Sequence, residues 1–210
     1  NISERPQVIR DADARSELAA IAEYALVHDR DILTVGEANG VGARQAEAWV
    51  GPRHRRLSMV MHFEHWHLET GQPEAPLDVP ALKRILDRWQ RALDGRGWNA
   101  LYLENTELPR VVSRWGDPTR HRRASATAFA TACFLQQGTP FLYQGQELGL
   151  ANPRFASLDD FRDVCAHQRI AELRAAGWGD GEILAELQRS GRDNARAPMP
   201  WDDGPHGGFS

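Results

Sequence analysis

Several acidic residues stand where an expected strand gives way to a loop. Glu37 follows the segment 31–36, which is expected to be a short buried strand with Ile32, Leu33 and Val35 as its apolar body. The expected strand 99–103 runs into a polar cluster with two further carboxylates, Glu104 and Glu107. Glycoside hydrolysis uses paired carboxyls, one as general acid and the other as nucleophile or base, and such groups lie at the carboxyl ends of barrel strands. Solvated carboxylates on two loops are the alternative that the spacing leaves open.

A second polar cluster, residues 191–202, combines arginine, aspartate, asparagine and tryptophan. Guanidinium groups present forked donors to hydroxyls or to a carboxylate, and an indole ring offers a flat face to a pyranose. The cluster therefore indicates a sugar-binding loop. A structured loop that is held together by Arg–Asp pairs is the alternative.

The segment 61–69 contains three histidines and two glutamates, which could be metal ligands. Its spacing matches neither H-E-x-x-H nor H-x-x-E-H. In an extended segment, His62 and Glu64 would face one way and His65 and His67 the other. We therefore expect a polar rim after a strand, with no metal site.

The elements that would position these groups alternate between strands and helices. Strands are expected over residues 31–36, 58–63, 99–103 and 140–143. Helices are expected over residues 16–26 and 180–188, and after Asp78, Asp117 and Ser157. Asp78 is the expected N-cap of its helix, and Asp160 completes a variant capping box with Ser157.

Strand–helix alternation with short connections is typical of a parallel α/β architecture. About four strand–helix units are visible, which is half of a closed (β/α)8 barrel of ~250 residues. We therefore expect residues 1–210 to form one partial barrel domain that is truncated and has no second domain.

The composition excludes several classes of protein. The 210 residues are 41% hydrophobic and 26% charged, with a net charge of -4, as in an ordinary soluble domain. The acidic balance gives no footprint for nucleic acid, and no apolar stretch approaches the roughly 20 residues of a membrane helix. Cys133 and Cys165 are expected to be buried free thiols of a cytoplasmic protein.

Several segments, in this order along the chain, resemble the α-amylase family of glycoside hydrolases, and in particular its α-glucosidase and oligo-1,6-glucosidase branch. They are residues 34–37, 63–65, 105–117, 138–149 and 192–203. The agreement runs over nearly the whole chain. The resemblance implies a (β/α)8 TIM barrel that cleaves α-glucosidic bonds with retention.

The resemblance also implies roles for individual residues. Glu37 matches the general acid/base of the family. Arg196, or its neighbour Arg192, matches the arginine that helps to close the pocket for the terminal glucose. Phe63 and Glu64 match a segment on the sixth strand, and we expect them to contact the substrate.

Thr106 and Glu107 stand where the family has His and Asp. Glu107 keeps the charge that stabilises the transition state but adds a methylene, and a displacement of about 1 Å can cost on the order of 10²-fold in rate. Thr106 can bond a sugar hydroxyl, but it is shorter than His and cannot carry a positive charge. The family's nucleophile is an Asp at the end of the fourth strand, and we expect it upstream of residue 1.

The sequence thus predicts the C-terminal half, about strands 5–8, of the TIM barrel of a retaining α-glucosidase that acts on α-glucoside oligosaccharides. This chemistry needs neither metal nor cofactor, and we expect the chain to be inactive without the missing N-terminal half. A sugar-binding or interaction protein without catalysis is one alternative, although retention of Glu37 argues against it. An α-glucosyl transferase or isomerase of altered specificity is the other.

Overall fold

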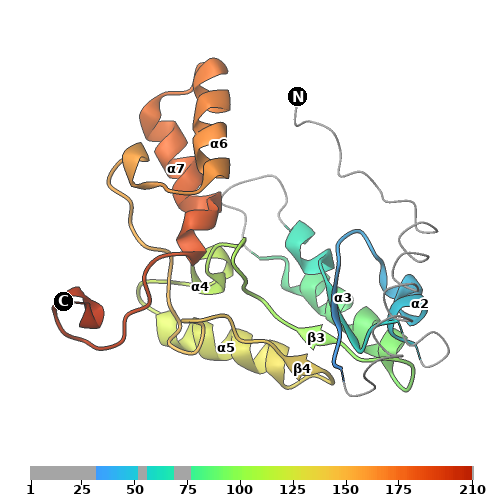
Figure 1. Cartoon of the computed structure of the whole chain (residues 1–210). Coiled ribbons are helices and arrows are strands. Elements are labelled where there is room, and N and C mark those ends of the chain that lie inside the picture. The colour runs from blue at the N-terminus through green and yellow to red at the C-terminus, as the bar shows by residue number, and fades with distance from the viewer. Residues whose placement is uncertain (1–31, 52–55, 69–76, 210) are drawn as a thin grey trace. The chain divides into compact units, whose positions relative to one another are not determined.

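A computed structural model describes most of the chain (Figure 1). The described ranges are residues 32–51, 56–68 and 77–209. The expected helix over residues 16–26 lies outside them. The described residues fall into two compact units. The first runs up to Leu101 and includes Gln136–Pro140, and the second comprises Tyr102–Leu135 and the chain from Phe141 onward.

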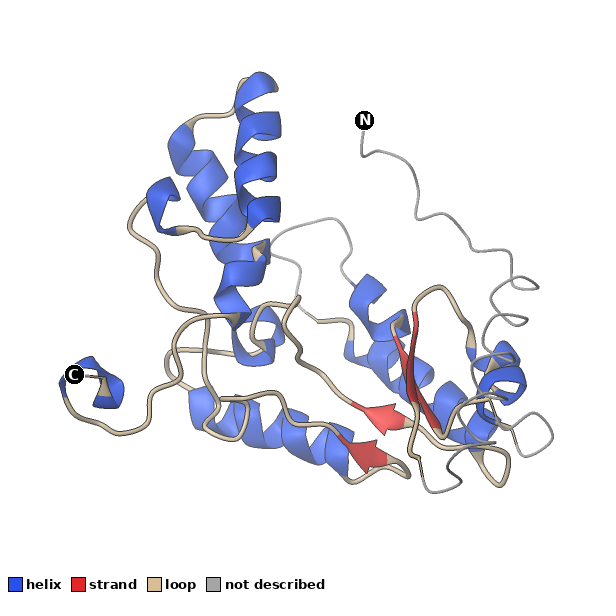
Figure 2. Cartoon of the chain, in the orientation of Figure 1, coloured by secondary structure: helices blue, strands red, loops and turns tan. Residues whose placement is uncertain are grey.

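The first unit is built on short parallel strands (Figure 2). In its described residues they are β1 (Val35–Ala38), β2 (Met59–His62), β3 (Ala100–Leu101) and β4 (Thr139–Pro140). β1 pairs with β2, β3 pairs with β4, and a parallel bridge between Val60 and Asn99 connects the two pairs. Successive parallel strands need crossover connections, and helices supply them here. The expected α/β class is confirmed.

The first strand begins further along the chain than the sequence predicts. Glu37 is the third residue of β1, whereas the sequence places it just after the strand. The pairing begins beside Thr34, whose hydroxyl accepts the N–H of Ser58 at 2.9 Å. Ile32 and Leu33, expected to be the buried body of the strand, are 41% and 63% exposed. That expectation is wrong, because these residues precede the strand pairing and do not enter the core.

Helix α3 (Val79–Leu93) starts as predicted. The Asp78 carboxylate accepts the N–H of Ala81 at 2.8 Å, which confirms Asp78 as the N-cap. Pro80 lies in the first turn, where a missing N–H does not break a helical hydrogen bond. The buried residues recur every three or four positions and so form one stripe: Leu82, Ile85, Trp89 and Leu93.

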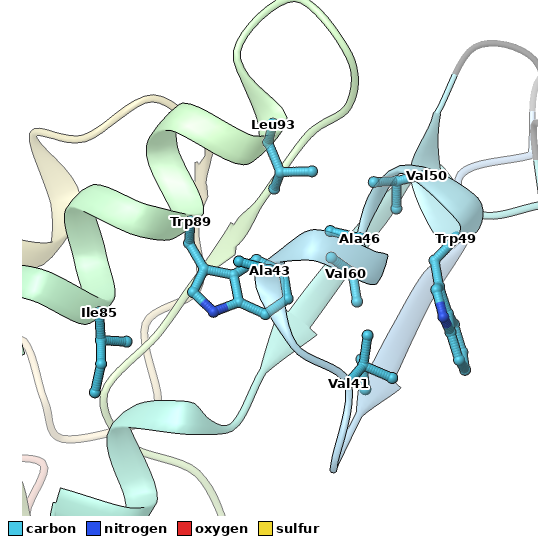
Figure 3. Close-up of a cluster of buried hydrophobic side chains, with 10 residues drawn as sticks. Val41, Ala43, Ala46, Trp49, Val50, Val60, Ile85, Trp89 and Leu93 are labelled. Carbon is cyan, nitrogen blue, oxygen red and sulfur yellow. The ribbon is translucent and has the colours of Figure 1, made fainter. Parts of the chain in front are cut away.

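The core of the first unit packs this stripe against the segment that follows β1 (Figure 3). That segment contains the 3-10 turn η1 (Ala43–Gln45) and the short helix α2 (Glu47–Val50). Trp89 and Val60 are completely buried. The buried side chains of the core are Ala38, Val41, Ala43, Ala46, Trp49, Val50, Val60, Ile85, Trp89 and Leu93.

The second unit is mainly helical. Its helices are α4 (Val111–Trp115), α5 (Arg122–Phe134), α6 (Val164–Ala175) and α7 (Asp180–Ser190). Helices α6 and α7 lie side by side (Figure 1) around a core of Phe161, Ala166, Ile170, Leu173, Ile183 and Leu187. Of the helices in the described ranges, none is long and apolar enough to cross a bilayer.

The helix expected from Ser157 is interrupted. Only the 3-10 turn η3 (Leu158–Asp160) follows Ser157, whose N–H donates to the Asp160 carboxylate at 3.0 Å. The backbone is then extended at Phe161, which brings this ring into the core. Asp163 caps α6 by accepting the N–H of Cys165 at 2.7 Å. The capping box of Ser157 and Asp160 is therefore confirmed, but it opens only the 3-10 turn η3, and the longer helix α6 begins after a second cap at Asp163.

The two cysteines differ in environment. Both are free thiols, and Cys133 is buried as expected. Burial raises the pKa of the Cys133 thiol to about 12. Cys165 is exposed, so the expectation of a second buried thiol is wrong. It lies in the first turn of α6, whose buried face begins at Ala166.

Two isoleucines of the first unit test this packing. We expect Ile85→Ala to lower the free energy of unfolding by about 2–5 kcal/mol, because it leaves a cavity in the core. Ile32→Ala is the matched control, and we expect it to cost less than about 1 kcal/mol because Ile32 is half exposed. Urea unfolding of the two variants measures both. An equal loss would show that Ile32 is a core residue after all.

Candidate functional site

Glu37 faces away from the core of the first unit. Side chains alternate along a strand, and the next residue, Ala38, is packed in that core. Glu37 is accordingly exposed, and in the parallel register it lies opposite Met61 of β2. The strand therefore presents this carboxyl group on the face that the helices do not cover.

Phe63 and Glu64 lie at the end of β2, where the turn η2 (Glu64–Leu68) begins. The Phe63 ring is buried and packs edge-on against Trp66, with ring centroids 4.6 Å apart. The Glu64 carboxylate accepts hydrogen bonds from Arg88 and from the N–H of Ala43. In this structure both side chains contact protein, and their role in binding substrate stays a prediction.

The histidines at the end of β2 and in η2 are not arranged as one extended strand would place them, because η2 is helical. The His62 ring stacks on Trp89 at 4.4 Å and meets the His65 ring edge-on at 5.1 Å. Both histidines are buried. Within the described ranges, no three His, Cys, Asp or Glu side chains are grouped to hold a metal ion.

The burial of His62 changes its acid–base chemistry. Removal from water disfavours the imidazolium and lowers the pKa of His62 to about 4. The negative charge of Glu64 opposes this change and the positive charge of Arg88 adds to it. His62 is therefore neutral at physiological pH and packs as an aromatic ring.

In the second unit, the structure separates the two carboxylates of the polar cluster. Glu104 and Arg110 form an ion pair at 3.0 Å, with side chains only 1% and 2% exposed. Glu104 also accepts the N–H of Val111 at 2.9 Å. Burial raises the pKa of Glu104, and these two partners offset part of the increase. The side chain of Glu107 is 45% exposed, so only Glu107 can meet a substrate directly.

Arg192 connects Glu107 to the C-terminal loop. Arg192 opens the turn η4 (Arg192–Ala195) and donates to the Glu107 carboxylate. It also donates to the Cys165 sulfur at 3.3 Å, and its Nε lies 3.9 Å from the Asp163 carboxylate. Partial burial by itself would lower the pKa of Arg192. The hydrogen bond to Cys165 and the charges of Glu107 and Asp163 outweigh this effect, so the pKa lies above its usual value and the guanidinium stays charged.

Arg196 holds the residue beside Glu107. Its Nε donates to the carbonyl oxygen of Thr106 at 2.8 Å, and its Nη1 pairs with Asp163. The N–H of Glu107 donates to the Asn105 side chain at 2.8 Å, which fixes the turn between them. The contacts of Thr106 with Arg196 thus run through its backbone.

The structure therefore brings together four of the predicted site residues: Thr106, Glu107, Arg192 and Arg196. Glu37, Phe63 and Glu64 belong to the first unit. Asp163 was missed, because the sequence pattern placed it inside a helix that was expected to start at Ser157. Its type, an aspartate directly before a helical segment, is the signal of an N-cap that could have identified it.

Known proteins resemble this chain over most of its length. Residues 5–210 match the family described as "Alpha amylase, catalytic domain". A probable oligo-1,6-glucosidase of Bacillus subtilis (strain 168) is 45% identical over 179 residues, which are 85% of this chain and 32% of the relative. An oligo-1,6-glucosidase of Parageobacillus thermoglucosidasius is 41% identical over 86% of this chain and 33% of the relative. The chain spans about a third of the length of these relatives.

Solved structures also resemble the fold of this chain. The trehalose-6-phosphate hydrolase of Bacillus licheniformis superposes with a TM-score of 0.83 and 36% identity. An isomaltulose synthase from Klebsiella sp. LX3 superposes with a TM-score of 0.81 and 28% identity. Each match covers 93% of this chain and 36% of the other.

The different environments of the two carboxylates can be tested by equivalent substitutions. We expect Glu104→Gln to lower the free energy of unfolding by about 3–5 kcal/mol, because it leaves the charge of Arg110 buried without its partner. Glu107→Gln, which breaks a half-exposed pair, should cost less than about 1 kcal/mol. Denaturant unfolding of both variants measures the difference. Similar losses would contradict the assignment of Glu104 as the structural carboxylate.

The buried histidine predicts a dependence of stability on pH. The unfolded chain binds a proton at His62 near pH 6.5, and the folded chain only near pH 4, so the unfolded state gains protons first. Stability should therefore fall as the pH is lowered from about 6.5 to 4, by up to about 3 kcal/mol from this group. Unfolding curves across this range should show a smaller loss for His62→Phe.

The matched control for this experiment is His167→Phe, because His167 is exposed on α6. We expect this variant to lose stability with falling pH as the wild-type chain does. If His62→Phe followed the same curve as the control, the pH dependence would not come from the buried ring.

Proposed function

The chain belongs to the α-amylase family of glycoside hydrolases, and on this basis we propose that it forms about strands 5–8 of the (β/α)8 barrel of a retaining α-glucosidase. The similarity to oligo-1,6-glucosidases over more than four fifths of the chain is the observation that carries the proposal. The substrates we assign are α-glucoside oligosaccharides.

The geometry of Glu37 supports its assignment as general acid/base. It stands on a parallel strand, on the side away from the core, and in a closed barrel that side is the interior. Near the carboxyl ends of the strands, such a position faces the substrate. In the proposed reaction the Glu37 carboxyl group protonates the glycosidic oxygen of the leaving group. Its carboxylate form then takes a proton from the attacking water.

The covalent step needs a second carboxylate, which attacks the anomeric carbon as the leaving group departs. We assign this nucleophile to an aspartate supplied from outside residues 1–210, since the chain corresponds to only a third of the related enzymes. The chain alone is accordingly proposed to be inactive, and the rest of the barrel is its required partner.

We assign Glu107 to stabilising the positive charge that develops on the sugar in the transition state. Its pairing with Arg192 orients the carboxylate and balances its charge before substrate arrives. The Thr106 hydroxyl and the two arginines are assigned to the sugar hydroxyls. A neutral sugar brings no counter-charge, so a site in which arginines are already paired with carboxylates suits it.

A transferase or isomerase of altered specificity is the second candidate. The structural similarity to an isomaltulose synthase favours it, and so do Thr106 and Glu107 at positions where the family has His and Asp. Incubation with isomaltose and, separately, with sucrose distinguishes the two candidates. Glucose from isomaltose identifies a hydrolase, whereas a rearranged disaccharide from sucrose identifies an isomerase.

The assignment of Glu37 predicts the outcome of one substitution in the whole protein that carries this chain. We expect Glu37→Gln to slow release of p-nitrophenol from p-nitrophenyl α-glucoside by at least about 10³-fold, because the amide can neither give nor take the proton. Glu47→Gln, on α2 of the same unit, is the matched control and should stay within twofold of wild type.

Three outcomes would count against the proposal. Equal turnover by Glu37→Gln and Glu47→Gln would exclude Glu37 as the acid/base. Hydrolysis by residues 1–210 alone would contradict the need for an external nucleophile. Binding of glucose without turnover by the whole protein would favour a sugar-binding protein that has lost its chemistry.

A further inference from the structure

Two segments of the second unit, residues 162–163 and 193–196, bind each other through a pair of aspartates. Asp193, in η4, accepts the backbone N–H groups of Arg162 and Asp163 at 2.8 and 3.1 Å. Asp163 in turn pairs with Arg196, just after η4. Each segment thus supplies a carboxylate that binds the other, and both carboxylates are largely buried.

The Asp163 carboxylate has a different task at each oxygen. Oδ1 accepts the N–H of Cys165 at 2.7 Å and so caps α6. Oδ2 pairs with Arg196 and lies 3.9 Å from Nε of Arg192. The side chain is only 4% exposed. Burial raises the pKa of Asp163, but the cap hydrogen bond and the two arginines outweigh it, so the pKa lies below its usual value.

The two arginines extend from Asp163 to neighbouring residues of one loop. Arg192 donates to the Glu107 carboxylate, and Arg196 donates to the Thr106 carbonyl at 2.8 Å. A cap of α6 needs only the first carboxylate oxygen. The second oxygen, which pairs with Arg196 and lies near Arg192, is therefore not needed for the cap.

We propose that Asp163 is a positioning residue, which fixes Arg192 and Arg196 and through them sets the place of the Thr106–Glu107 segment. This inference rests on the proposed function, in which that segment binds the glucosyl unit. Without the negative charge, Arg196 loses its ion pair and Arg192 keeps Glu107 as its carboxylate partner. The guanidinium groups and the Thr106–Glu107 segment would then shift together.

Asp163→Asn separates the two tasks of the side chain. Asparagine caps helices as well as aspartate does, so α6 should stay intact, while the charge that holds the arginines is removed. We expect kcat/KM for p-nitrophenyl α-glucoside to fall by about 10–100-fold in the whole protein, as for other small displacements of site residues. Asp163→Glu keeps the charge and should retain more activity than Asp163→Asn.

Asp160→Asn is the matched control. The Asp160 carboxylate also accepts backbone N–H groups, those of Ala156 and Ser157. We expect kcat/KM of this variant to stay within twofold of wild type. If Asp163→Asn does not fold, Asp163→Ser takes its place, because serine also caps a helix without charge.

A second measurement reads the position of the arginines without relying on activity. The Nε–H of Arg196 is held by the Thr106 carbonyl, so it should exchange slowly with water in the wild-type protein. NMR of ¹⁵N-arginine-labelled protein, from the preparation used for the assays, should show at least tenfold faster exchange in Asp163→Asn. The Asp160→Asn variant should exchange as the wild-type protein does.

The two measurements distinguish failure of this inference from failure of the proposed function. If the whole protein does not hydrolyse α-glucosides but exchange at Arg196 still accelerates in Asp163→Asn, positioning by Asp163 stands and the proposed function fails. Unchanged exchange at Arg196 would overturn the inference, whatever the activity of the variant. Faster exchange with unchanged kcat/KM in an active protein would also overturn it.

Discussion

The buried ion pair between Glu104 and Arg110 is the interaction on which the second unit depends. Opposite charges removed from water are tolerated only when each meets the other and the remaining polar atoms find partners. Arg110 donates to the carbonyl groups of Gln144 and Ala195, and Glu104 accepts the N–H of Val111. Three distant parts of the chain are thus joined around one guanidinium group. One of them is the turn that carries Arg192.

The candidate sugar-binding residues extend from this turn, and here too each charge is paired with an opposite charge. Arg192 and Arg196 are each paired with a carboxylate, Glu107 for the first and Asp163 for the second. Paired charges orient one another and leave the remaining N–H donors in defined directions. In the first unit, strand alternation has the comparable effect, because it packs Ala38 in the core and turns Glu37 away from it.

The sequence predicted the features that depend on residues a few positions apart. The N-cap at Asp78 is one, since an Asx side chain bonds an N–H three residues later. The alternation of strands and helices and the α/β class are others. The motifs around Glu37 and Glu107 also identified the family, because they are short and occur in a fixed order along the chain.

Only the tertiary structure decided which residues of the same type are buried and which are exposed. It buried Glu104 and left Glu107 half exposed, although both follow the same strand. It also placed Ile32 outside the core, and gave Asp163 an arginine partner 33 positions further along the chain. Burial and ion pairs depend on contacts between distant segments, and a local pattern of residue types contains no information about which segments meet. The sequence by itself therefore determined the family and the candidate chemistry, and the tertiary contacts decided which side chains hold the others in place.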